Sequence, residues 1–185
     1  MKQQTTTGLG LSDTTGLVKA AIVAAIYVVL TLMVAPLSFG VIQFRVSEIL
    51  NFLGLYNPRY IVAITLGVVI ANMFNPASYG VADMLIGSLS TFVFLWLGRI
   101  VGERLVALLA KIGKYQVQPM IIKYLALIVV FSLSMITIAF MICHFENIWP
   151  LFWPTYWSLV ASEAGVLSLG ALVMYPLATR IDFHS

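Results

Sequence analysis

Long apolar runs separated by short polar breaks dominate this sequence of 185 residues. Hydrophobic residues make up 61% of the chain and charged residues only 9%, and the mean hydropathy is +1.01. Because soluble domains carry about 25% charged residues, this chain has too few charges to cover a surface that faces water. The sequence therefore predicts an integral membrane protein, and its length fits a single domain.

Six apolar runs follow a polar N-terminal tail over residues 1–16, and a spanning helix needs about 20 apolar residues. We expect spans over 17–35, 46–56, 60–74, 83–109, 119–145 and 154–177. The second and third runs are short, so a single re-entrant hairpin in their place is the alternative. We therefore predict an all-α bundle of six transmembrane helices over residues 17–180.

The basic residues predict how these spans are oriented, because cytoplasmic loops are enriched in lysine and arginine. With six spans and a cytoplasmic N-terminus, nine of the ten basic residues fall at cytoplasmic ends, although Arg99 lies inside the fourth run. Arg45 alone falls on the outer side. We expect both termini to be cytoplasmic, and topology does not explain Arg45.

Arg45 and Glu48 lie three residues apart at the edge of the second apolar run. Charges in such a place are costly and usually functional. At this spacing the two side chains meet if the helix begins before Arg45. We expect one or both to contact a substrate, and an ion pair that fixes the entry of the second span is the alternative.

Three further polar residues lie in or beside apolar runs. Asn72 needs a hydrogen-bond partner in a dry region, on another helix or a ligand. Asp83 begins the fourth run, where it either caps the helix or contacts the ligand. Glu163 lies about 14 Å into the sixth span at 1.5 Å per residue, and a carboxylate near mid-membrane needs a partner, a proton or a cavity. We expect all three to line a binding site.

Trp149, Trp153 and Trp157 cluster around the last outer loop and the start of the sixth span. An interfacial aromatic belt is one interpretation. The other is a wall on which a flat ligand stacks, with Trp157 as the binding residue. We expect Glu146, at the end of the fifth run, to face water.

Ala20, Ala21, Ala24 and Ala25 place small residues four apart in the first run. Such a face lets helices approach closely, either within this chain or against another membrane subunit. The chain has no nucleotide-binding loop and no nucleophile elbow, so we expect no enzymatic activity. A single cysteine and few, scattered basic residues indicate no metal site, no cofactor and no nucleic acid.

The arrangement of these residues resembles the QueT family. The resemblance covers about residues 17–102 and returns at 162–164, with the run at 43–48 as its specific part. Serine precedes Glu163, where the family has glycine. The matching segments are Lys19-Ala20-Ala21, Ala24-Ala25, Gln43-Phe44-Arg45-Val46-Ser47-Glu48, Ile70-Ala71-Asn72, Asp83, Gly87-Ser88 and Thr91.

The resemblance implies a queuosine-precursor transporter of the bacterial plasma membrane, namely the substrate-binding S component of an energy-coupling factor (ECF) transporter. Such a component binds a vitamin-like solute near the outer face and topples in the membrane to release it. It docks through the alanine face of its first helix onto an integral membrane scaffold subunit that carries two ATPase subunits. The implied ligand is a 7-deazaguanine such as 7-aminomethyl-7-deazaguanine.

Two alternatives to this reading stay open. One is an S component for another vitamin-like solute, such as pyridoxine or hydroxymethylpyrimidine. The other belongs to a different class, a stand-alone channel or a membrane protein whose charges are only structural. Co-purification with a scaffold and two ATPases separates an S component from that second class.

Overall fold

Every regular element of the described chain is a helix, as the sequence predicts. The computed structural model describes residues 14–39, 44–75, 79–113 and 117–184. The described residues include two 3-10 helices, η1 (Val46–Phe52) and η3 (Trp149–Leu151), and one π-helical turn, η2 (Asp83–Gly87). The elements are α1 (Thr14–Met33), α2 (Ala35–Ser38), η1 (Val46–Phe52), α3 (Leu53–Tyr56), α4 (Pro58–Met73), η2 (Asp83–Gly87), α5 (Ser88–Ile112), α6 (Pro119–Leu133), α7 (Met135–Phe145), η3 (Trp149–Leu151) and α8 (Phe152–Ala178).

Four helical segments of the described chain are long and apolar enough to cross a membrane. They are Thr14–Met33, Asp83–Ile112, Pro119–Phe145 and Trp149–Ala178. The predicted second and third spans correspond to the shorter apolar helices Val46–Tyr56 and Pro58–Met73. These helices are those of a multi-pass membrane protein, while the count of six spans and the cytoplasmic termini stay predictions.

Two helix boundaries follow from local sequence. Pro58 begins α4, where the first-turn N–H has no intrahelical partner in any case. Asn57 caps this helix, because its side chain accepts a hydrogen bond of 3.1 Å from the Arg59 backbone N–H. At the N-terminus α1 begins at Thr14, three residues before the predicted start of the first span at residue 17. Residues 1–13 of that tail lie outside the described residues.

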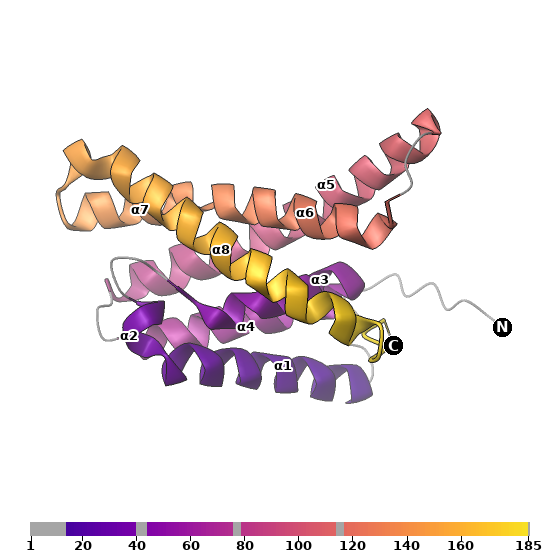
Figure 1. Cartoon of the computed structure of the whole chain (residues 1–185). Helices are drawn as coiled ribbons and strands as arrows, with labels where there is room; N and C mark the ends of the chain where they lie inside the picture. Colours follow the sequence, from indigo (N-terminus) through magenta and orange to yellow (C-terminus); the bar gives the residue numbers. More distant parts are fainter. Residues whose placement is uncertain (1–13, 40–43, 76–78, 114–116, 185) are drawn as a thin grey trace.

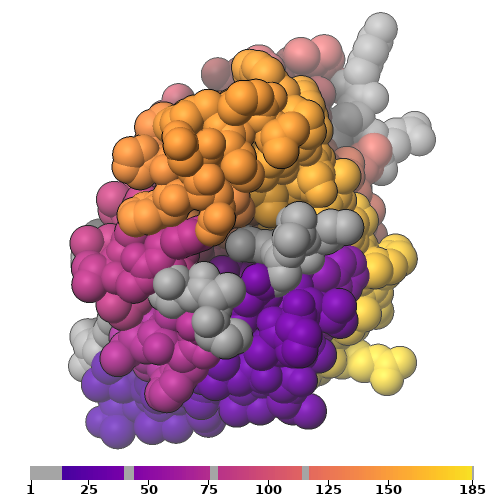
Figure 2. All heavy atoms as spheres, turned by 90° about the vertical axis from the view of Figure 1, so that its left-hand side faces the viewer, coloured from indigo at the N-terminus to yellow at the C-terminus, as the bar shows by residue number. Residues whose placement is uncertain are grey.

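The helices form two groups joined by α5 and crossed by α8 (Figure 1). One group contains α1, α3 and α4, and the other contains α6 and α7. α5 packs against both α4 and α6, and α8 contacts η1, α6 and α7. The start of α1 and the end of α8 lie at the same end of the molecule (Figure 1). Figure 2 shows the opposite end of the molecule. This end is formed by the segments around α2, η2 and the α7–η3 turn.

Glycines allow the elements around the centre of the molecule to approach closely. A Cβ added at Gly67 of α4 would lie 2.9 Å from the Cβ of Tyr27 on α1. A Cβ added at Gly170 of α8 would lie 2.7 Å from Ile49 Cγ2 and 3.1 Å from Ile49 Cα in η1. The position of η1 therefore depends on a residue without a side chain at position 170.

Arg99, the basic residue inside the fourth apolar run, has structural partners in the described chain. Its Nη1 donates hydrogen bonds of 2.8 Å and 3.3 Å to the carbonyls of Gly54 and Leu55. Its Nε lies 3.1 Å from a carboxylate oxygen of Glu103, one turn further along α5. A cation is favourable at the carbonyl end of a helix, so Arg99 fixes the end of α3 against α5.

Cysteine labelling at the two ends of the η2–α5 segment tests the predicted orientation. Both test residues are exposed. Val81 lies just before the start of this segment, and Lys111 lies near its end. We expect a membrane-impermeant maleimide to label Val81→Cys in intact cells and Lys111→Cys only in inverted vesicles. The native Cys143 is fully buried and provides an unlabelled background. Labelling of Lys111→Cys in intact cells contradicts the orientation.

Two glycine-to-alanine changes on α8 form a matched pair. Gly170→Ala should destabilise the protein by about 1–3 kcal/mol, because the added methyl meets the Ile49 backbone. Gly165→Ala should stabilise it by about 0.5–1 kcal/mol, since a Cβ at Gly165 meets nothing within 4 Å and alanine favours the helix. Unfolding midpoints in detergent measure both effects, and equal shifts would contradict the close packing of η1 on α8.

Candidate functional site

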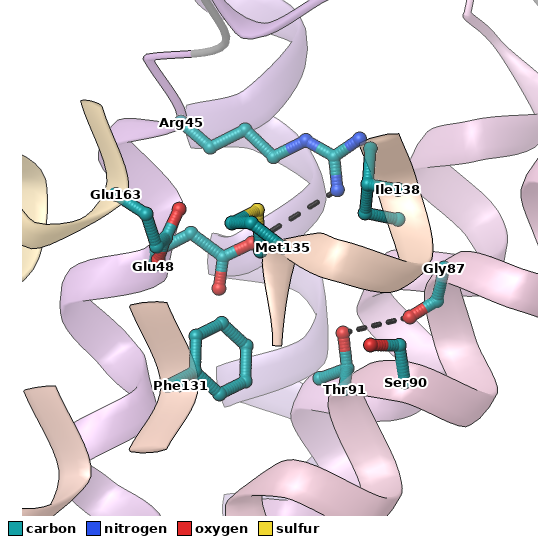
Figure 3. Close-up of a pocket in the computed structure, with 9 residues that line it drawn as sticks. All are labelled: Arg45, Glu48, Gly87, Ser90, Thr91, Phe131, Met135, Ile138 and Glu163. Carbon is teal, nitrogen blue, oxygen red and sulfur yellow. Dashed lines mark hydrogen bonds and ion pairs between the residues drawn. The ribbon is translucent and has the colours of Figure 1, made fainter. Parts of the chain in front are cut away.

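A small cavity lies between η1, the η2–α5 segment, the α6–α7 segment and α8 (Figure 3). Its volume is about 20 Å³. It joins residues that are far apart in the sequence, and it is the place where Arg45, Glu48 and Glu163 meet. The lining residues are Arg45, Glu48, Gly87, Ser90, Thr91, Phe131, Met135, Ile138 and Glu163.

The buried carboxylate of Glu48 has three partners. The hydroxyl of Tyr27 on α1 donates a hydrogen bond of 2.7 Å to Oε1, and the side-chain amide of Asn51 donates one of 2.5 Å to Oε2. The Arg45 guanidinium lies 3.9 Å from Oε1 (Figure 3). Glu48 is only 3% exposed. Donors and a cation around a buried carboxylate offset the loss of its hydration.

Hydroxyl groups tie the same segment to α1 at a second point. Thr31 Oγ1 and Ser47 Oγ are 2.6 Å apart, and Thr31 Oγ1 also donates to the Tyr27 carbonyl at 2.8 Å. Ser38 Oγ donates to the Thr31 carbonyl at 3.0 Å. All of these side chains are buried. The start of η1 is therefore held against α1 by adjacent residues, Ser47 and Glu48.

Arg45 forms the ion pair with Glu48 that the sequence left open as the alternative to substrate contact, and it has further contacts. Its Nη2 donates to Asn72 Oδ1 and its Nε to the Ser38 carbonyl, both at 3.4 Å. Its guanidinium carbon lies 5.4 Å from the centre of the Phe39 ring, within reach of a cation–π interaction. The arginine that topology does not explain is thus held by neighbouring side chains. Gln43, from the same run, lies outside the described residues.

Asn72 and Asp83 support the cavity wall without lining it. The Asn72 amide donates a hydrogen bond of 2.9 Å to the Asp83 carbonyl, so its predicted partner is found within the chain. A Cβ at Gly87 would lie 2.7 Å from Asn72 Nδ2, which places this amide behind the wall at Gly87. Ala82 occupies the cap position of η2, and Asp83 is the first residue of that helix.

The Asp83 carboxylate holds the segment before η2 instead. It accepts a hydrogen bond of 2.7 Å from the Tyr79 backbone N–H and one of 3.3 Å from the Asn75 side chain. The Tyr79 hydroxyl donates to exposed Glu146 at 2.9 Å, and its ring stacks on Phe145. Partial burial, followed by the hydrogen bond and charge of Glu146, raises the pKa of Tyr79 to about 12. Tyr79 therefore stays protonated at neutral pH and connects this segment to the end of α7.

Glu163 enters the cavity from α8 (Figure 3). It is 4% exposed, and its Oε1 has no hydrogen-bond partner among the described residues. Glu163 interacts electrostatically with both Glu48 and Arg45. Of the partner, the proton and the cavity that the sequence left open for this carboxylate, the structure shows a cavity.

Trp157 is 56% exposed and does not line the cavity. Trp149 and Trp153 are also exposed, as an interfacial belt requires. Phe131 supplies the aromatic ring in the cavity, although sequence reasoning did not single it out. The sequence analysis also did not identify Tyr27. The sequence offered a reason to do so, because a tyrosine within an apolar span needs a partner for its hydroxyl.

The alanine face of α1 is divided between two environments. Ala20 and Ala24 are buried within the chain, where α1 packs against α4. Ala21 and Ala25 are exposed on the outside of the helix. Only the second pair is accessible to another membrane subunit in this structure.

Comparisons with known proteins relate this chain to one family of transporters. The model of the family described as "QueT transporter" matches residues 17–179. A protein of Lactococcus lactis subsp. cremoris (strain MG1363), named "Queuosine precursor transporter QueT", is 38% identical over 174 residues, which cover 92% of this chain and 96% of that protein. No solved structure matches the chain. The family match spans all of the elements that surround the cavity, and the chain therefore belongs to the QueT transporter family.

Proposed function

We propose that this chain is the substrate-binding S component of an ECF-type transporter, and that it captures a queuosine precursor, a 7-deazaguanine, for ATP-driven uptake. The observation that carries the proposal is the cavity in which Arg45, Glu48 and Glu163 meet inside an otherwise apolar chain. Ionisable groups at such a depth mark a binding site or a pathway. The name of the Lactococcus lactis relative supports the solute class.

The chemistry of the cavity suits a guanine-like solute. A guanine edge offers adjacent N–H donors, and a carboxylate accepts such a pair in charge-assisted hydrogen bonds. Glu48 is held in one orientation by Tyr27 and Asn51, so it is preorganised to accept them. Phe131 offers a ring face for stacking, and we assign stacking to it rather than to Trp157.

A solute of this size requires the cavity to expand. A volume of about 20 Å³ holds about one water molecule, which is far less than a bicyclic ring system needs. Phe131, Met135 and Ile138 line the cavity on either side of the break between α6 and α7 at Ser134. We propose that α7 shifts about this break when the solute enters.

Uptake against a gradient needs an energy source, and we assign it to partner subunits. The sequence has no nucleotide-binding loop, so two ATPase subunits would act through an integral membrane scaffold. Exposed Ala21 and Ala25 on α1 give a face on which a scaffold helix could approach closely. The complex would reside in a bacterial plasma membrane.

Calorimetry with the purified protein and 7-aminomethyl-7-deazaguanine tests the solute. Glu48→Gln removes one partner of a buried charge pair, which costs about 2–5 kcal/mol, or about 30-fold or more in affinity. Glu146→Gln is the matched control, because that acid is exposed and outside the cavity, and it should change little. Arg45→Ala should also weaken binding.

The calorimetry also distinguishes a wrong solute from a wrong role for Glu48. If the wild-type protein binds no 7-deazaguanine, the solute assignment fails and a pyridoxine-like solute becomes the better candidate. If it binds one and Glu48→Gln, eluting as a monodisperse species, binds equally well, the solute stands and the assigned role of Glu48 does not.

Replacing Ala25 with tryptophan tests docking through α1. A bulky side chain on the exposed face should prevent close approach of a scaffold helix. We expect Ala25→Trp to lose co-purification with the scaffold and ATPases while it retains solute binding. Leu172→Trp, at an exposed position on α8, is the control and should assemble normally. Normal assembly of Ala25→Trp would exclude this face, and no co-purification of the wild type would favour a stand-alone channel.

A further inference from the structure

The charges that line the cavity do not balance. Two carboxylates, those of Glu48 and Glu163, face a single guanidinium, that of Arg45. Ser90 and Thr91 are the other residues with polar side chains in the lining, and neither carries a charge. When both acids are ionised, one of them is left without a counter-charge in a region of low dielectric constant, which is costly.

The hydrogen bonds show which carboxylate lacks a partner. The two carboxylate oxygens of Glu48 accept hydrogen bonds from Tyr27 and Asn51, and Arg45 lies next to them. Glu163 has a buried Oε1 without a hydrogen-bond partner among the described residues. A second carboxylate close by adds repulsion to this position. Glu163 is therefore the group to which a cationic donor would bring the largest gain.

We propose that Glu163 is the receptor for a positively charged group of the transported solute, and that it selects cationic over neutral members of one solute class. The inference rests on the proposed function only in taking that class to be the 7-deazaguanines. An aminomethyl substituent is an ammonium ion at neutral pH, and it would donate to Glu163 in a charge-assisted hydrogen bond. The ring edge would then remain for Glu48, which lines the same cavity.

Two ligands with the same ring system isolate the effect of charge. 7-Aminomethyl-7-deazaguanine is cationic, whereas 7-cyano-7-deazaguanine is neutral and of similar size. By calorimetry, we expect the wild-type protein to bind the amine at least about 10-fold more tightly than the nitrile. Glu163→Gln keeps the shape of the side chain and removes its charge. This variant should lower the affinity for the amine by about 30-fold. Its affinity for the nitrile should stay within about 3-fold of the wild-type value.

Two variants serve as controls. Glu163→Asp retains the charge, so the preference for the amine should persist even where both affinities fall. Glu146→Gln neutralises an exposed acid that does not line the cavity and should change neither affinity. Binding of the nitrile by Glu163→Gln shows that this variant is folded.

The outcomes distinguish this inference from the proposed function. Equal binding of the two ligands by the wild-type protein, or an equal loss of both in Glu163→Gln, would overturn the role of Glu163 while the proposed function stands. If neither ligand binds to the wild-type protein, the proposed function fails, and the inference fails with it. A preference for the amine that disappears in Glu163→Gln and persists in Glu163→Asp supports both.

Discussion

The buried carboxylate of Glu48 is the constraint on which the centre of this structure depends. In a chain that is 61% hydrophobic, an ionised group is stable only where donors and a cation surround it. Tyr27 brings α1 to that group, Asn51 fixes the turn of η1, and Arg45 extends the network to Asn72 on α4. The position of η1 between α1 and α8 thus follows from the needs of a single side chain, together with the absence of one at Gly170.

Irregular backbone is concentrated around the cavity. Glu48 lies in the 3-10 helix η1, Gly87 in the π-helical turn η2, and Met135 follows the break at Ser134. Within a membrane, departures from the α-helix persist only where the backbone is buried in protein or lines a cavity, and π-turns are frequent at functional sites. The cavity beside these departures is lined by residues from four parts of the chain, three of which contribute polar side chains.

Sequence periodicity and charge placement predict a large part of this arrangement, and the limits have physical causes. The helical class and the break at Pro58 follow from apolar runs and proline. Arg45 does meet Glu48, but it precedes η1 in an extended conformation, so the helical spacing that predicted the meeting is not its cause. Phe131 was not predicted, because an aromatic residue in an apolar run cannot be told from ordinary core. The division of the alanines into a buried and an exposed pair depends on the rotation of α1 about its axis, which composition does not determine.

The exception to the charge pattern and the chemistry of the cavity have one explanation. Nine basic residues fit a cytoplasmic bias, whereas Arg45 falls on the predicted outer side. There it pairs with Glu48, while Glu163 Oε1 has no hydrogen-bond partner among the described residues. A second arginine would balance the cavity and remove its reason to bind a cation, while the loss of Arg45 would leave two repelling carboxylates and destabilise the empty state. Under the role proposed for Glu163, one guanidinium for two carboxylates is the composition that would limit repulsion in the empty protein and still favour a cationic solute.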